Sequence, residues 1–156
     1  MKKISVYTFY SIVLLTAVNL QSCAKDSTKV VVSSSNSKES HNLGKNCMSC
    51  HTSGTEAGNE GGVFNIAGSV YDSTLLNANS NSTIYMYTGP GATGTLKYTI
   101  PVDQNGNFYA TGGVDFSVAL YPVVQGSSST YHMSSPTSSG ACNSCHNVTT
   151  DKIWVN

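Results

Sequence analysis

The chain is 156 residues long and carries eight lysines, no arginine and eight acidic residues, which gives a formal net charge of +0. Without arginine or a basic cluster, the sequence lacks the groups that read phosphates and base edges, so we expect no nucleic-acid binding. Only 10% of the residues are charged, whereas serine, threonine and asparagine are plentiful, as suits an exported β-protein. The length suits one domain with its own core.

The first 22 residues have the pattern of a secretory signal peptide. Lys2 and Lys3 precede an apolar run that is short for a membrane-spanning helix, and small residues precede a cleavage position. The ending LQSC at residues 20–23 resembles the lipobox of bacterial lipoproteins. This resemblance implies that Cys23 receives lipid and anchors the protein to the cell envelope, in the periplasm or at the outer membrane and cell surface. An ordinary signal peptide or an uncleaved anchor is the alternative.

Residues 23–40 are rich in serine and lysine, with one short apolar island at Val30–Val32. Such a stretch buries too little apolar surface to offset the entropy that it loses on ordering. We therefore expect a flexible tether between the lipid and the folded part.

The middle of the chain, residues 63–124, alternates strand-forming and turn-forming segments. Val, Ile, Tyr, Phe and Thr gather in short runs bounded by Asn, Gly, Pro and Asp, which predicts antiparallel strands. Asn105 and Gly106 tolerate positive φ and lie between apolar flanks, so a tight hairpin turn is expected there. The predicted strands cover residues 63–72, 82–89, 96–103, 106–110 and 115–124.

This segment resembles the transthyretin-like and carboxypeptidase-regulatory β-sandwich modules. The likeness rests on AGSVYD at 67–72, STIYMYTG at 82–89 and VDQNGNFY at 102–109. It implies a small antiparallel β-sandwich that acts as a spacer or a binding surface and carries no catalysis.

The most informative feature is a five-residue pattern that occurs twice, as CMSCH at 47–51 and CNSCH at 142–146. Two cysteines separated by two residues and followed by histidine are what covalent c-type haem attachment requires. Each thiol adds to one vinyl group of the porphyrin, and the histidine reaches the iron as proximal ligand. The predicted proximal ligands are His51 and His146, and the predicted haem-attaching residues are Cys47, Cys50, Cys142 and Cys145.

Two other uses of these cysteines stay open. In an oxidising compartment the four could form two disulfides, and the paired Cys-x-x-Cys segments could meet as a four-cysteine zinc site. Neither use explains why a histidine follows both second cysteines in a chain with only four histidines. Haem is therefore the preferred interpretation.

With these motifs the chain resembles small di-haem c-type cytochromes. The likeness covers the two motifs and their flanks, and it implies two covalently attached haems c, with attachment outside the cytoplasm. We expect loop or short-helix haem-binding segments at residues 41–62 and 125–156, on either side of the β-sandwich. The predicted fold is therefore mainly β.

Each iron has a sixth position, and few side chains are available to fill it. His41 lies shortly before the first motif, and His132 and Met133 lie shortly before the second. These three are the candidate distal ligands, and the sequence does not assign them to one iron or the other. Met48 is excluded because it lies inside its own motif, and Met86 is expected in the core of a strand.

Two six-coordinate haems indicate electron transfer rather than catalysis. Catalytic haem sites need acids, bases or donors near an open position, and this chain has no arginine and only two histidines outside the motifs. We therefore expect an electron carrier in a membrane-associated respiratory chain, with other cytochromes or a membrane oxidoreductase as redox partners. The alternatives are a haem enzyme or small-ligand sensor with one open iron position, and a structural module that binds zinc through four cysteines.

Overall fold

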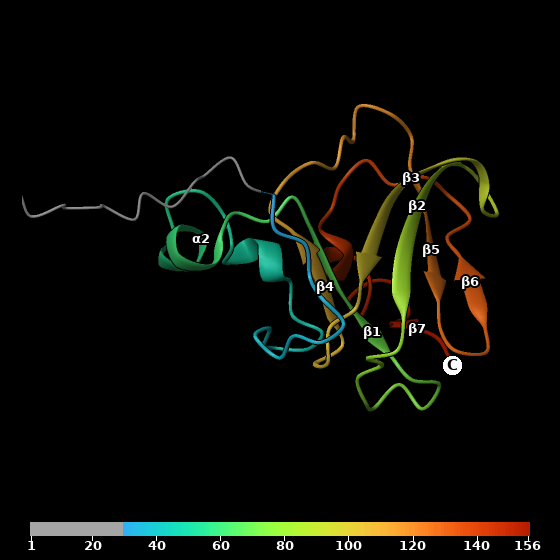
Figure 1. The fold of residues 1–156 in the computed structure, drawn as a ribbon, viewed down its shortest axis with the longest axis horizontal. Coiled ribbons are helices and arrows are strands. Elements are labelled where there is room, and N and C mark those ends of the chain that lie inside the picture. The colour runs from blue at the N-terminus through green and yellow to red at the C-terminus, as the bar shows by residue number, and fades with distance from the viewer. Residues whose placement is uncertain (1–29) are drawn as a thin grey trace, which may run out of the picture.

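The structure, a computed structural model, describes residues 30–156. The predicted signal peptide and the predicted lipidation site Cys23 lie outside the described residues. In the described part, seven strands form two sheets (Figure 1). The strands are β1 (Ile66–Tyr71), β2 (Thr83–Gly89), β3 (Thr93–Pro101), β4 (Asn107–Ala110), β5 (Tyr121–Gln125), β6 (Thr130–His132) and β7 (Ile153–Trp154). The helical segments are η1 (Cys47–Ser49), α2 (Glu56–Gly61) and η2 (Cys142–Ser144).

The smaller sheet has the strand order β4-β1-β7. β1 runs antiparallel to β4, with Ile66 opposite Ala110. It runs parallel to β7, with Val70 opposite Ile153. All six residues of β1 are buried, as expected for a central strand that is covered on both faces. The parallel β1–β7 pair is a departure from the purely antiparallel sandwich that the sequence predicts.

The larger sheet has the order β3-β2-β5-β6 and is antiparallel throughout. β2 and β3 form a hairpin whose pairing shifts twice, between Met86 and Tyr87 and between Tyr87 and Gly89. β3 forms one edge of the sheet, and its first five residues, from Thr93 to Lys97, are exposed. β6 forms the other edge and is exposed along its length.

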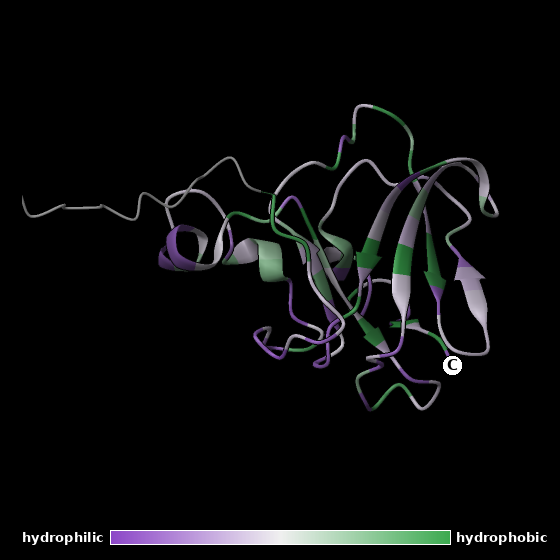
Figure 2. Cartoon of the chain, viewed as in Figure 1, coloured by the Kyte–Doolittle hydropathy of each residue, from purple (hydrophilic) through white to green (hydrophobic). Residues whose placement is uncertain are grey.

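Apolar side chains from both sheets pack into one core. Burying one such side chain stabilises the fold by about 1.5–3 kcal/mol. Figure 2 shows hydrophobic stretches on β1, β2, β3 and β5, whereas α2 is mostly hydrophilic. The largest fully buried side chains are Phe108, Ile66, Met86, Ile100 and Leu120. These features confirm the predicted mainly β fold with the form of a small β-sandwich. No helix within residues 30–156 has the length and apolarity needed to cross a bilayer.

One predicted strand is shorter than expected, because residues 115–120 do not join β5. Asp115 Oδ1 accepts a hydrogen bond from the Ser117 N–H over 2.8 Å, which closes a local turn in place of strand pairing. The strand therefore begins only at Tyr121. β6 and β7 were not predicted, because three and two residues are too few to show an alternating pattern.

The turn at Asn105 and Gly106 forms, but it does not close a hairpin within one sheet. Gly106 has φ of 79°, whereas Asn105 is not among the residues of positive φ. Asp103 Oδ1 accepts hydrogen bonds from the N–H groups of Asn105 and Asn107, each over 3.0 Å. The flanking strands β3 and β4 belong to different sheets. The turn therefore passes the chain from one layer of the sandwich to the other.

The expected tether is partly packed, because its described part lies along β4. The Ser33 N–H donates to the Tyr109 carbonyl and the Thr111 N–H donates to the Val31 carbonyl, each over 2.9 Å. Ser33 is only 3% exposed. The Tyr109 carbonyl and the Thr111 N–H, in β4 and just after it, are not used in the pairing of β4 with β1, so they are free to make these bonds. The predicted tether is thus tied to the sandwich at these residues.

Candidate functional site

The two Cys-x-x-Cys-His motifs have the same local geometry. Each begins with a single 3-10 turn, η1 in the first and η2 in the second. In each, the histidine N–H donates to the carbonyl of the first cysteine, over 2.9 Å from His51 to Cys47 and 3.0 Å from His146 to Cys142. The backbone therefore presents the two cysteines and the histidine of each motif in the same way.

A serine stabilises the turn of each motif. Ser49 Oγ donates to the Asn46 carbonyl over 2.7 Å, and Ser144 Oγ donates to the Ala141 carbonyl over 2.6 Å. Both bonds reach back three residues, which is a common way for serine to close a turn. This bond explains structurally why serine stands before the second cysteine in both motifs.

Both motif histidines are held through the same ring nitrogen. His51 Nδ1 lies 3.2 Å from the Gly62 carbonyl, and His146 Nδ1 lies 2.7 Å from the Asp151 carbonyl. A carbonyl oxygen only accepts, so Nδ1 carries the proton in each ring and Nε2 keeps its lone pair. A backbone carbonyl on Nδ1 is the usual support for a histidine that binds a metal through Nε2.

The His51 ring is also fixed by its packing. It stacks on Phe64 with ring centroids 4.0 Å apart and an interplanar angle of 4°. Phe64 in turn stacks on Tyr109 at 4.7 Å. On another side lies Gly61, where an added Cβ would come within 2.8 Å of His51 Cε1. Gly62 follows with φ of 92°, a backbone conformation that favours glycine and that delivers its carbonyl to Nδ1.

The first motif borders a cavity of about 530 Å³. Its lining contains both cysteines of the motif, His51 and the candidate distal ligand His41. The ring centroids of His41 and His51 are 6.0 Å apart, and the ring planes differ by 39°. Two imidazoles that bind opposite sides of one metal ion, through nitrogens at about 2.0 Å, have ring centroids roughly 6 Å apart. The structure therefore places His41 at a suitable distance from His51 for shared coordination.

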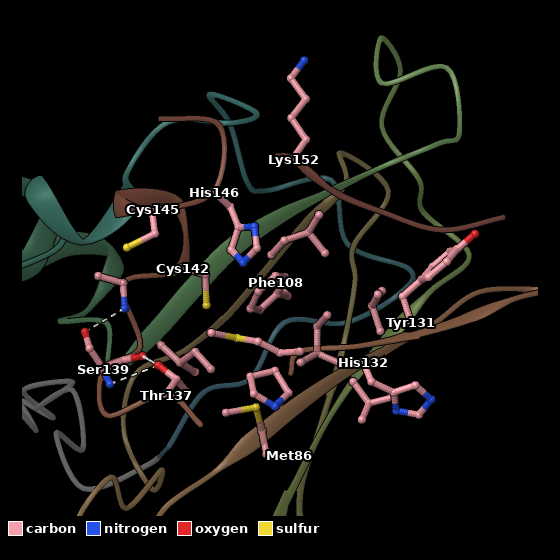
Figure 3. Close-up of a pocket in the computed structure, with 18 of the residues that line it drawn as sticks. Met86, Phe108, Tyr131, His132, Thr137, Ser139, Cys142, Cys145, His146 and Lys152 are labelled. Carbon is pink, nitrogen blue, oxygen red and sulfur yellow. Dashed lines mark hydrogen bonds between the residues drawn. The ribbon is translucent and has the colours of Figure 1, made fainter. Parts of the chain in front are cut away.

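The second motif borders a different cavity, of about 290 Å³, whose walls come from both sheets (Figure 3). Its lining contains both cysteines of the motif, His146 and the other two candidate ligands, His132 and Met133. Met133 is half-buried, whereas His132 is exposed. Met86, which the sequence places in the core, is fully buried and also lines this cavity.

All four motif cysteines are free thiols. Burial raises the pKa of the Cys142 thiol to about 12, and burial likewise raises the pKa of Cys47. Both therefore stay protonated at neutral pH in the metal-free protein. Within residues 30–156 no three His, Cys, Asp or Glu side chains are gathered in the way that a metal ion requires. The four thiols thus form neither disulfides nor a four-cysteine cluster in this structure.

β1 positions both motifs. The Ala67 N–H donates to the Gly140 carbonyl over 2.9 Å, which ties the segment before η2 to this strand. The Gly44 N–H, just before η1, donates to Ser69 Oγ over 2.9 Å. Two segments from opposite ends of the described chain therefore meet at one strand. The sequence carries no local signal for this meeting, nor for Phe64 as the residue that stacks on His51.

Comparisons with known proteins give no match: no protein-family model, no curated protein and no solved structure matches this chain.

Proposed function

We propose that this protein is an exported di-haem c-type cytochrome that transfers electrons in a membrane-associated respiratory chain. The observation that carries the proposal is the repeated histidine geometry. His51 and His146 each have Nδ1 bonded to a backbone carbonyl, and each lines a cavity together with the two cysteines of its own motif. Free Nε2 atoms beside paired thiols are the donor set that haem c requires.

The cysteines would attach the two haems. Each neutral thiol adds across one vinyl group, so that its sulfur forms a thioether and its proton goes to the other vinyl carbon. The raised pKa values of Cys47 and Cys142 are compatible with this use, because no thiolate has to persist in the finished protein. The bound haems supply one-electron redox chemistry, and the chain orients them and excludes water from their faces.

The two sites would have different axial ligands. His41 and His51 give the first site two imidazoles, whereas the second site combines His146 with Met133, or with His132 as the alternative. Methionine ligation raises the reduction potential relative to histidine ligation. With Met133 as its ligand, the haem of the second site would therefore have the higher reduction potential.

An electron carrier fits these cavities better than an enzyme. Catalysis at a haem needs acids, bases or donors beside an open position, and the chain contains no arginine. In this proposal His41 and Met133 serve instead as ligands. In this proposal Cys23 carries the lipid that holds the protein at the cell envelope, and the partners are other cytochromes or a membrane oxidoreductase.

The decisive experiment is a haem count. The chain is expressed with a cytochrome c maturation system, and the purified protein is measured by the pyridine haemochrome assay and by intact-mass spectrometry. We expect two haems that stay attached under denaturing conditions. Bound zinc without a Soret band would refute the proposal.

A further inference from the structure

Two features of the described residues link one motif to the other, a buried polar cluster and a shared aromatic wall. We propose, on the basis of the function proposed above, that the two haem sites are one coupled redox pair. Asn143 and Ser69 hold the two attachment segments together, and Phe108 is shared by the walls of the two sites.

Asn143 is the first spacer residue of the second motif, yet its side chain reaches the segment just before the first motif. Its Nδ2 donates to the Lys45 carbonyl over 2.9 Å and to Ser69 Oγ over 2.9 Å. Its Oδ1 accepts from the Ser69 N–H over 3.2 Å. The residue is only 3% exposed. A buried amide with both donors and its acceptor in use fixes the geometry of its partners.

Ser69, on β1, is the centre of this polar cluster. Its Oγ accepts from the Gly44 N–H over 2.9 Å, in addition to the bond from Asn143, and donates to Asn107 Oδ1 over 2.6 Å. Asn107 Nδ2 then donates to the His41 carbonyl over 3.2 Å. The cluster therefore connects the second motif to both the entry of the first motif and the backbone of its candidate distal ligand.

Phe108, on β4, lines both cavities. Its side chain is 1% exposed and lies against Gly68 of β1. At Gly68 an added Cβ would clash with the ring and would come within 2.9 Å of Cys142 Cβ. Glycine therefore leaves the room that the ring needs beside the second motif. The two cavities thus share one aromatic side chain as part of their walls.

These contacts give the pair a fixed arrangement. The cavity of the first motif and His41 and the cavity of the second motif both have Phe108 in their lining. An electron that leaves one site reduces the other, so the exchange needs no proton and no further reactant. A protein of this kind stores two electrons and exchanges them internally.

The two motifs offer a matched control, because Met48 holds the position in the first motif that Asn143 holds in the second. Met48 is half-buried, whereas Asn143 is buried and bonded across the motifs. Spacer residues of Cys-x-x-Cys-His do not bind the haem, so substitutions at both positions leave the attachment chemistry intact.

The experiment uses electron paramagnetic resonance on the fully oxidised protein with two haems. Its spectrum is compared with the sum of the spectra of two single-haem proteins, Cys47→Ala/Cys50→Ala and Cys142→Ala/Cys145→Ala. We expect the native spectrum to be broadened relative to the sum. Asn143→Ser should lose part of this broadening, and Met48→Ser should keep it.

A second measurement tests whether Phe108 takes part in electron exchange between the sites. Phe108→Leu should slow electron exchange between the sites after photoreduction. Phe116→Leu, at a half-buried residue that packs against the core and lines neither cavity, should leave the rate unchanged. A two-haem protein whose spectrum equals the sum overturns the coupled pair and leaves the proposed function standing. A protein without haem overturns both. The comparison of the native two-haem protein with the two single-haem proteins uses no spacer variant. It therefore tests the coupled pair even if Asn143→Ser does not fold.

Discussion

The first and second Cys-x-x-Cys-His segments have the same backbone but different surroundings. The first borders a cavity whose lining includes several polar loop residues, and it faces a histidine across that cavity. The second borders a cavity lined in part by core residues of both sheets, with Met86 and Met133 in its lining. The motif thus sets how the cysteines and the histidine are presented, whereas the fold sets which other side chains line the cavity beside them. Two copies of one short pattern therefore give two sites of different character.

The largest expected effect comes from removing one site. Cys142→Ala/Cys145→Ala should reduce the covalent haem content from two to one, because the second motif then has no thiol to form a thioether. Intact-mass spectrometry measures the loss directly. Cys47→Ala/Cys50→Ala is the matched variant and should give the same count. Two covalent haems in either variant would contradict the assignment of these cysteines.

The next largest effect tests the histidine pair of the first site. In the Cys142→Ala/Cys145→Ala background, which keeps only this site, His41→Met should raise the midpoint potential, because one imidazole is replaced by a thioether. Potentiometric titration followed by optical absorption measures the shift. In the same background His132→Ala should change nothing, because His132 lines only the other cavity. An unchanged potential in His41→Met would show that His41 is not a ligand.

The opposite change tests the second site. Met133→His should lower the midpoint potential of this site and leave the first nearly fixed, since histidine replaces the thioether ligand. The measurement is a titration of the two-haem protein, read against the single-haem proteins. His132→Ala is the control and should leave both midpoints in place. If Met133→His has no effect and Met86→Leu changes the spectrum, Met86 is the ligand in its place.

The smallest effect concerns the aromatic support of His51. Phe64→Leu removes the stacking of this side chain on both His51 and Tyr109. Aromatic pairs contribute about 0.5–1.5 kcal/mol each beyond the area that they bury, so we expect a loss of about 1–2 kcal/mol in the free energy of unfolding. Denaturant titration measures it. Phe116→Leu serves as a control for the loss of a ring elsewhere, and a smaller loss in Phe64→Leu than in this control would contradict a role for the stack.

The sequence predicts the strands of the sandwich well where they are long and bounded by turn residues, as for β2 and β3. It does not predict β7, because two residues show no period and the partner strand β1 lies far away in the chain. It also predicts a free tether over residues that in fact bond to β4, because composition alone does not reveal an available strand edge.

The candidate site, like the fold, is only partly predictable from the sequence. Both motifs are visible in the sequence, since their spacing is local, and so are His41 and Met133 as ligand candidates. Their assignment to separate cavities needs the fold, because it depends on which cavity each loop reaches. The sequence does not single out Phe108 or Asn143. No local pattern indicates that Phe108 lines a cavity rather than only the core, or that the side chain of Asn143 is hydrogen-bonded.

The exposed edge at β3 has a consequence for how two copies of the protein can meet. Nine residues of open strand are a template on which a second copy could add its own strand. The two shifts in pairing with β2 distort this edge, and the exposed Lys97 places a charge on it. Both features oppose sheet-to-sheet aggregation. Neighbouring copies are thereby less able to join through this edge.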